Sequence, residues 1–275
     1  MEKVSDEQYG ARKLGKQKDE PHARVPRTGT SMVVALSIAI AIGGATSLSL
    51  ASSTRPDQAN EKKTMNESTL SVKQQAIAPI AAFAATGDMA RLEAALNSGL
   101  DAGLSVSEAK EILVQLYAYA GFPRSLNALG QLMKVTEGRR QRGITDVPGH
   151  ESSRPAPTGD ALLAAGTANQ TQLAGAPVKG PLFEFAPAID QFLKTHLFGD
   201  IFQRDNLDWQ SRELATVGAL GALTGVESQL QSHIRISLNT GLSSSQLRQL
   251  ARNLAEQGNV DAGARVQAAI DKVSE

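Results

Sequence analysis

The stretch DWQSRELATVGALGALTGVESQLQSHIRISLNTGLSSSQ, residues 208–246, carries the signals of three successive helices. Its alanine-rich first part, 208–223, begins with an N-cap aspartate and is followed by a glycine, which is typical of one complete helix. A second helix is expected over 226–239, again followed by a glycine. Ser243 and Gln246 form an S-x-x-Q capping box for a third helix. The stretch therefore predicts a run of helices joined by short glycine turns.

The same pattern occurs 138 positions earlier in the chain. Ten residues recur at this spacing without a gap: Ala81, Ala84, Thr86, Gly87, Leu92, Leu100, Gly103, Leu104, Ser105 and Ser107 recur as Ala219, Ala222, Thr224, Gly225, Leu230, Leu238, Gly241, Leu242, Ser243 and Ser245. A repeat of this kind is typical of duplicated supersecondary units that pack on one another. The chain is therefore expected to contain two similar halves that share one core.

The first half has its own helix signals. Ser105 and Glu108 form a capping box that corresponds to the one in the second half. The sequence GFP at 121–123 ends the pattern, and its proline is suited to the first turn of a further helix over 124–134. No segment shows the alternation of polar and apolar residues that is typical of a strand. The predicted fold class is all-α.

The N-terminal segment has the pattern of a signal peptide. Residues 1–31 are polar with a net charge of +2, and residues 32–42 are almost wholly apolar. This apolar run is short for a membrane span, which needs about 20 residues. Ser49 and Ala51 supply the small residues of a cleavage site. We therefore predict that 1–51 is removed and that the mature chain is periplasmic or secreted; the alternative is an uncleaved N-terminal anchor.

Composition divides the rest of the chain into two repeats and two connections. The polar segment 52–72 is expected to be a linker, followed by the first repeat at 73–137. Prolines and glycines mark a second linker at 138–182, with a short helix expected at 160–165. The second repeat follows at 183–275. Because loops this long are uncommon inside a compact domain, 138–182 is interpreted as the connection between the halves.

Composition also excludes several classes of function. The 275 residues contain 28 basic and 28 acidic side chains, and aromatic residues make up only 4%. A neutral chain with few aromatics lacks the basic surface and the stacking platforms of a nucleic-acid-binding protein. The absence of cysteine excludes a thiol nucleophile, a disulfide framework and a cysteine metal site. Four histidines leave little material for a metal centre, so we expect neither a metal ion nor a nucleic acid as a partner.

Three residues of the second half are candidates for acid/base chemistry. His233 lies on the apolar face of its helix, and Glu213 is expected to lean inward from the preceding helix, so the two can meet. A buried glutamate that orients a histidine suits proton transfer near neutral pH. Glu227 lies near the same face at a helix N-terminus, where an acid also stabilises the helix dipole. The first-half counterparts of Glu213, Glu227 and His233 are Gln75, Met89 and Ala95. Only the second half therefore holds the titratable set; the alternative is a core histidine with exposed glutamates.

Three further residues are candidates for binding a substrate. His196 precedes a predicted turn, where it is either a second proton carrier or a surface histidine. Tyr119 lies just before the glycine break at 121, where it either acts in the site or packs the end of a helix. Arg124 begins a predicted helix, where it either meets a carboxylate of the substrate or is solvated.

Several motifs resemble one family in order along the chain. The string YAYAGFPRSLNA at 117–128 resembles the Y-A-G-x-P-x-x-x-x-A signature of the carboxymuconolactone decarboxylase family. RELAT at 212–216, followed by GVESQLQSH at 225–233, is similar to that family's R-x-L-x-T…G-x-E-x-x-L-x-x-H segment. The turn at 241–243 is similar to its G-[LV]-[ST] motif. The resemblance extends over most of the predicted mature chain.

The resemblance implies an alkyl hydroperoxidase D-like helical fold, with two tandem repeats packed as one core, that assembles as a trimer or hexamer. It also implies decarboxylation of 4-carboxymuconolactone or, in the other branch, thiol-based peroxide reduction. Gly225 and Ser228 occupy the positions of the peroxidase cysteines, so this chemistry is excluded. Gln115 occupies a position where decarboxylases commonly have a histidine. The lactone pathway is cytoplasmic, so an exported copy is expected to act on another substrate.

These observations lead to one functional expectation and one alternative. The expected function is cofactor-independent acid/base chemistry, a decarboxylation or related lyase reaction, on a small lactone or organic acid. His233 would donate or accept the proton, Glu213 would orient it, and Glu227 would assist. The small-molecule substrate and further copies of the chain are the expected partners, and no stable membrane span is expected after cleavage. The alternative is a non-catalytic oligomeric binding or scaffold protein that lost the active site.

Overall fold

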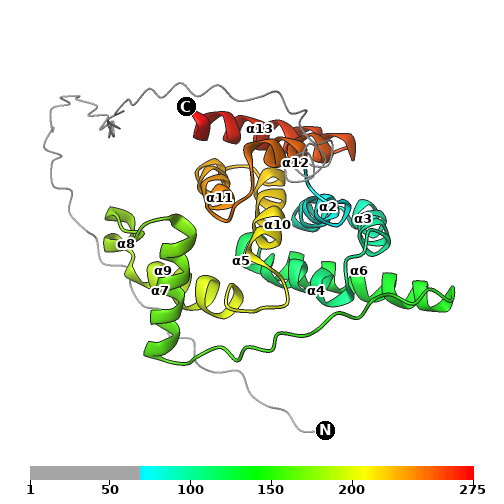
Figure 1. Cartoon of the computed structure of the whole chain (residues 1–275), viewed down its shortest axis with the longest axis horizontal. Coiled ribbons are helices and arrows are strands. Elements are labelled where there is room, and N and C mark those ends of the chain that lie inside the picture. The colour runs from blue at the N-terminus through cyan, green and yellow to red at the C-terminus, as the bar shows by residue number, and fades with distance from the viewer. Residues whose placement is uncertain (1–68) are drawn as a thin grey trace, which may run out of the picture. The chain divides into compact units, whose positions relative to one another are not determined.

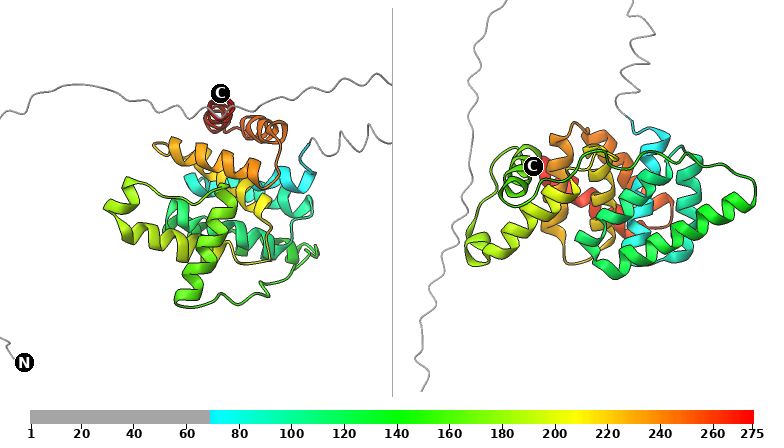
Figure 2. Two further views of the ribbon diagram at one scale, coloured as in Figure 1. Left: turned by 60° about the vertical axis from the view of Figure 1, so that its left-hand side comes forward. Right: turned by 90° about the horizontal axis from the view of Figure 1, so that it is seen from below.

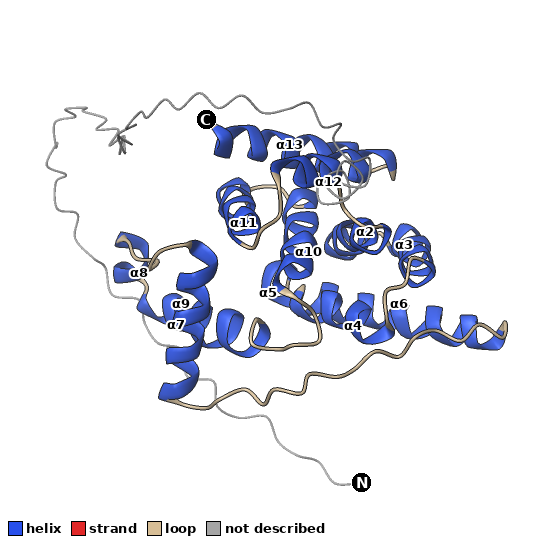
Figure 3. Cartoon of the chain, in the orientation of Figure 1, coloured by secondary structure: helices blue, strands red, loops and turns tan. Residues whose placement is uncertain are grey.

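The computed structural model describes residues 69–275, and these residues form helices and no strand (Figures 1 and 3). The helices are α2 (Val72–Thr86), α3 (Met89–Asp101), α4 (Val106–Gln115), α5 (Tyr117–Ala120), α6 (Phe122–Gln141), α7 (Asp160–Ala174), α8 (Pro181–Phe185), α9 (Pro187–Phe192), the π-helix η1 (Leu193–Ile201), α10 (Trp209–Ala222), α11 (Glu227–Asn239), α12 (Ser244–Glu256) and α13 (Val260–Ser274). The predicted signal peptide 1–51 and most of the linker 52–72 lie outside the described residues. Within 69–275, no helix combines the length and apolar character needed to cross a membrane.

The duplication predicted from the sequence is present in the order of the helices. The series α2, α3, α4 in the first half corresponds to α10, α11, α12 in the second. Both predicted capping boxes are formed, by Ser105 with Glu108 and by Ser243 with Gln246. Each serine side chain accepts a hydrogen bond from the backbone three residues later, which satisfies a donor that the helix leaves open. The all-α, two-repeat prediction is therefore confirmed.

One hydrophobic core joins the two halves, and it includes buried side chains from α2 and α3 as well as from α10 to α13. Helices α2 and α10 pack closely at its centre. A Cβ atom added at Gly218 of α10 would lie only 2.5 Å from the carbonyl oxygen of Ala78 in α2. Glycine is therefore required here, because a larger residue would push the central helices apart.

Two glycine substitutions are expected to change stability in opposite directions. Gly218→Ala should lower the free energy of unfolding by about 1–3 kcal/mol, because its methyl group overlaps the backbone of α2. Gly130→Ala in α6 meets no atom within 4 Å, and alanine should stabilise that helix by about 0.5–1 kcal/mol. Urea denaturation followed by circular dichroism measures both. Equal effects of the two substitutions would contradict close α2–α10 packing.

The first half ends in a helix that is longer than predicted, followed by an extended segment, residues 142–159, which we call the strap. Helix α6 extends beyond the predicted 124–134, and its last turn carries the buried Arg139, which binds Asp101 and Asp146. The chain then runs without a helix along residues 142–159 to α7 (Figures 1 and 2). The backbone of this segment is bound to the start of α4, because the Val106 N–H donates to the carbonyl oxygen of Val147 over 2.9 Å.

The segment 138–182 contains a full helix where a short one was expected. Helix α7 begins at Asp160 as predicted and continues to Ala174, beyond the predicted end at 165. It packs against η1 at close range, because a Cβ at Gly166 would lie 1.7 Å from the carbonyl oxygen of Lys194. A small second hydrophobic cluster lies here: Leu173, Leu197, Phe198, Ile201, Phe202 and Ile236. The pattern predicts too short a helix because only three residues of α7 are buried, Gly166, Gln170 and Leu173, and one of them is polar.

Candidate functional site

A buried glutamate and a buried histidine meet between α10 and α11. Glu213 Oε2 lies 2.8 Å from His233 Nδ1. Glu213 has no exposed surface, and the His233 side chain is 9% exposed. The two helices are consecutive and joined by a short turn, which brings their inward faces together as the sequence pattern predicts. His233 Nε2 makes no hydrogen bond within residues 69–275, so Glu213 holds one ring nitrogen while the other stays available for a proton.

Tyr119 of the first half completes the cluster. Its ring stands edge-on to the His233 ring, with 5.4 Å between the centroids. Its hydroxyl oxygen is fully enclosed and makes no hydrogen bond of normal geometry within residues 69–275. Burial, together with the nearby negative charge of Glu213, raises the pKa of Tyr119. The hydroxyl therefore remains a neutral donor at all physiological pH values.

Glu213 depends on His233 for its hydrogen bonding. Its second oxygen, Oε1, is buried and has no hydrogen-bond partner among the described residues. A buried carboxylate without full pairing is costly, and such groups are concentrated at functional sites. The contact with His233 is therefore the main interaction that compensates this charge.

A second buried polar cluster surrounds Arg212, the neighbour of Glu213 on α10. Arg212 Nη2 donates to Glu111 Oε1 over 2.8 Å, and both side chains are almost completely buried. Arg204 Nε donates to the same carboxylate over 2.9 Å, and Asn206 Nδ2 donates over 3.0 Å. Gln115 completes the cluster, since its Oε1 accepts a hydrogen bond from Arg212 Nη1 over 3.2 Å.

The charge of Glu111 is stabilised by these contacts. Burial alone raises the pKa of a carboxyl group, but the hydrogen bond from Arg204 and the charge of Arg212 outweigh it, so the pKa of Glu111 lies below its usual range. Burial lowers the pKa of Arg212, although an arginine stays protonated under ordinary conditions. The cluster ties α4 of the first half to α10 of the second, and thereby fixes the helix that carries Glu213.

The family model for the carboxymuconolactone decarboxylase family matches residues 57–133 and 187–271, more than half of the chain. The chain belongs to the carboxymuconolactone decarboxylase family. Its two matched regions correspond to the two repeats of the structure. None of the curated proteins searched matches this family member. It has no cysteine, so the thiol-based chemistry of the peroxidase branch is chemically excluded.

Glu227, predicted to assist His233, does not join the cluster. It is exposed in the first turn of α11, where its carboxylate accepts a hydrogen bond from the Gly225 N–H over 3.0 Å. Hydrogen bonds from backbone N–H groups lower the pKa of Glu227. It lies six positions before His233, which is roughly 9 Å along a helix axis. Within residues 69–275 its carboxylate therefore binds the backbone before α11 and makes no hydrogen bond with His233, and its assisting role stays a prediction.

Arg124 and His196 also lie apart from the Glu213–His233 pair. The exposed guanidinium of Arg124 covers Gly87, at the end of α2. The exposed His196 pairs with Asp200, with 2.8 Å from Nδ1 to Oδ2. Its ring also contacts Tyr117, which stacks on Phe122. Of the three predicted binding residues, only Tyr119 contacts His233. The sequence pattern could not separate the three, because it does not reveal which surface a loop or helix end faces.

The buried charges of Glu111 and Arg212, and the partly exposed Arg204 that joins them, were not selected from the sequence. One feature of the sequence could have indicated them: Arg212 is a charged residue within the long apolar stretch of α10, and it has no exposed surface. A buried charge needs a partner, so this pattern indicates an ion pair. The carboxylate that pairs with it belongs to Glu111, 101 residues away, which sequence spacing alone does not identify.

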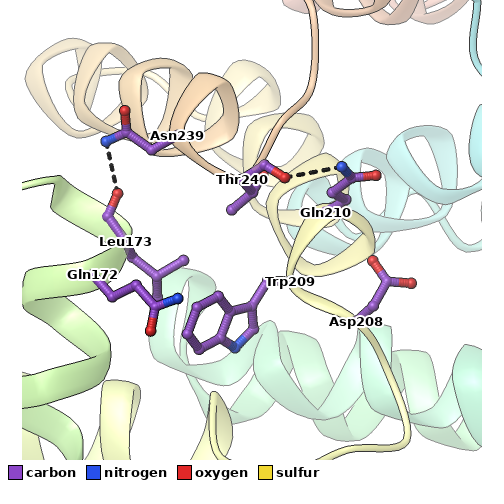
Figure 4. Close-up of a pocket in the computed structure, with 7 residues that line it drawn as sticks. All are labelled: Gln172, Leu173, Asp208, Trp209, Gln210, Asn239 and Thr240. Atoms are coloured by element: carbon purple, nitrogen blue, oxygen red, sulfur yellow. Dashed lines mark hydrogen bonds between the residues drawn. The ribbon is translucent and has the colours of Figure 1, made fainter. Parts of the chain in front are cut away.

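A surface pocket of about 390 Å³ lies where α7 meets the start of α10 and the end of α11 (Figure 4). Its lining residues are Gln172, Leu173, Asp208, Trp209, Gln210, Asn239 and Thr240. Hydrogen bonds from Asn239 to the Leu173 carbonyl and from Gln210 to the Thr240 carbonyl close its walls. None of the predicted site residues lines this pocket. Among residues 69–275, no group of three or more acidic or histidine side chains is placed to hold a metal ion.

Proposed function

We propose that this family member carries out cofactor-independent acid/base chemistry on a small lactone or organic acid, as a decarboxylation or related lyase reaction. The observation that supports it is the buried contact of 2.8 Å between Glu213 and His233 Nδ1, with no hydrogen bond to Nε2 from any of the described residues. A histidine held in this way by a carboxylate has a defined tautomer and can exchange a proton through its other nitrogen.

The proposed reaction uses the imidazole as the proton donor. The bond between the substrate carbon and its carboxylate breaks, CO₂ leaves, and the electron pair stays on carbon as an enolate. The protonated His233 then donates its Nε2 proton to that carbon and is reprotonated from solvent. Glu213 accepts the hydrogen bond from Nδ1 and orients the ring, and Tyr119 positions the ring by its edge contact.

The enclosure of His233 supports a second candidate. The histidine residue is only 7% exposed, so a substrate must reach Nε2 through a narrow opening. A buried glutamate–histidine pair also serves as a structural link between two helices. On this alternative, the protein is a non-catalytic oligomeric binding or scaffold protein, and the pair only stabilises the core.

The test compares His233→Asn with a matched control at another histidine. Asparagine can still donate a hydrogen bond to Glu213, but it has no second nitrogen to carry the proton. With 4-carboxymuconolactone and a panel of small β-keto acids, we expect His233→Asn to lower kcat by at least about 10²-fold. His150→Ala, exposed in the strap, should retain the wild-type rate. CO₂ release measures turnover, and circular dichroism measures folding. Unchanged turnover in His233→Asn, or none in the wild type, would favour the scaffold.

We also propose that residues 1–51 direct export and are removed. The basic segment followed by the short apolar run 32–42 supports this, as do the small residues before Ser52. Sequencing the N-terminus of the mature protein should give Ser52 as the first residue. An intact N-terminus in the membrane fraction would instead support the uncleaved anchor.

A further inference from the structure

A pocket of about 200 Å³ in the first half occupies the position equivalent to the Glu213–His233 site. It is lined by Val72, Gln75, Ala76, Ala95, Ser98, Ala102, Asn253 and Gln257. At the repeat spacing of 138 residues, Gln75 is equivalent to Glu213 and Ala95 is equivalent to His233. Gln257 of the second half is equivalent to Tyr119 of the first half at the same spacing. The pocket therefore surrounds the first-half copy of the cluster.

Hydrogen bonds support this equivalence independently of the lining. Asn253 of α12 donates through Nδ2 to the carbonyl oxygen of Gln75 in α2, over 2.6 Å. At the position equivalent to Asn253, Gln115 donates to the carbonyl oxygen of Arg212 in α10, over 2.9 Å, one residue before the position that corresponds to Gln75. In each half, an amide side chain ties the first helix to the third helix of the other half. The two sites are thus built on the same framework.

The difference between the sites is chemical. The side chains that line the first-half pocket carry no charge, so neither a carboxylate nor an ammonium group would be compensated there. Gln75 and Gln257 use their Nε2 donors on the Leu70 carbonyl and on Asn253, at 2.8 and 2.9 Å. Their carbonyl oxygens make no hydrogen bond within residues 69–275, so two acceptors are available to a ligand.

Alanine at 95 leaves the space that an imidazole ring fills at His233. In the second half, that ring donates its N–H to a carboxylate oxygen of Glu213. In the first half, Gln75 lines the pocket at the equivalent position, beside Val72 and Ala76. A cavity needs roughly 10–15 Å³ to hold a single water molecule, so this pocket has room for a small organic ring.

We propose that the first-half pocket is a binding site for a small uncharged azole or related planar N–H donor. The ligand ring lies where His233 lies in the other half, and its N–H donates to Gln75. This site is distinct from the proposed catalytic one and does not depend on whether His233 is catalytic.

Imidazole itself is the probe, at pH 9, where it is mainly uncharged because imidazole side chains titrate at about 6.5. Wild-type protein is titrated and followed by NMR. We expect saturable shifts at the backbone amides of Gln75, Ala95 and Ser98. Ala95→His places a ring in the pocket and should weaken imidazole binding about tenfold or more, equivalent to about 1.4 kcal/mol or more. Ala94→His, at the exposed neighbouring position, adds the same ring outside the pocket and should leave binding unchanged.

A second variant decides the question if Ala95→His does not fold. Gln257 is exposed at the rim, so Gln257→Trp should cover the opening while the circular dichroism spectrum stays that of the wild type. It should also weaken binding. The proposal is overturned if wild-type protein shows no saturable shifts, or if the shifts centre on His233. It is equally overturned if the folded pocket variants bind imidazole as Ala94→His does.

Discussion

Replacing Glu111 by alanine is expected to lower the free energy of unfolding by about 3–5 kcal/mol, because the change leaves a buried charge without its partner. The carboxylate of Glu111 accepts hydrogen bonds from Arg212, Arg204 and Asn206. Arg212 has no exposed surface, so water cannot replace the lost carboxylate. Urea denaturation measures the loss, and the helical signal at low urea shows whether the variant still folds.

The matched control is another glutamate–arginine pair on the surface. Glu137 binds Arg140 over 2.8 Å, and both side chains are largely exposed. Exposed pairs contribute little, because water and salt screen their attraction. Glu137→Ala should therefore leave the urea midpoint almost unchanged. A midpoint in Glu111→Ala that matches this control would show that the buried network does not hold α4 to α10.

The Glu111 carboxylate should also make the stability of the protein depend on pH. The pKa of Glu111 is lowered in the folded state, because its hydrogen bonds and the charge of Arg212 outweigh burial. A lowered folded pKa contributes stability above the unfolded value of about 4.3 and loses it as the pH falls towards the folded pKa. Between pH 5 and pH 3, wild-type protein should therefore lose more stability than Glu111→Gln. Parallel pH profiles would contradict this assignment.

Removing His233 is the second change with a large expected effect. His233→Ala leaves the carboxylate of Glu213 buried without its only partner, because Oε1 already has none within residues 69–275. Breaking a buried pair in this way should cost about 3–5 kcal/mol of unfolding free energy. His233→Asn keeps a donor for Glu213 and should cost clearly less, which is why asparagine is the better variant for measuring turnover.

A double variant separates the pair from the loss of packing. Glu213→Leu removes the buried charge, so adding it to His233→Ala should recover part of the lost stability. The coupling between the two positions is expected to be about 0.5–3 kcal/mol. Urea denaturation of the wild type, both single variants and the double variant gives this value. Additive effects would mean that the contact of 2.8 Å contributes nothing to stability.

The features that could be predicted from the sequence depend on residues close together along the chain. The capping boxes at Ser105 and Ser243 depend on residues three positions apart, so the sequence reveals them directly. The inward direction of Glu213 and His233 follows from helix periodicity, and the short turn between their helices makes the contact expected. The extent of α6 and α7 was underestimated, because polar and small residues give a weak helical pattern.

The sequence by itself determined the helices, their duplication and the concentration of titratable groups in one of the two equivalent sites. These depend on spacing along the chain. Only the tertiary structure decided that Tyr119 contacts His233 and that Arg212 pairs with Glu111. The physical reason is distance along the chain: these contacts depend on how helices from different halves pack, and helix periodicity specifies which face is buried but not which partner covers it.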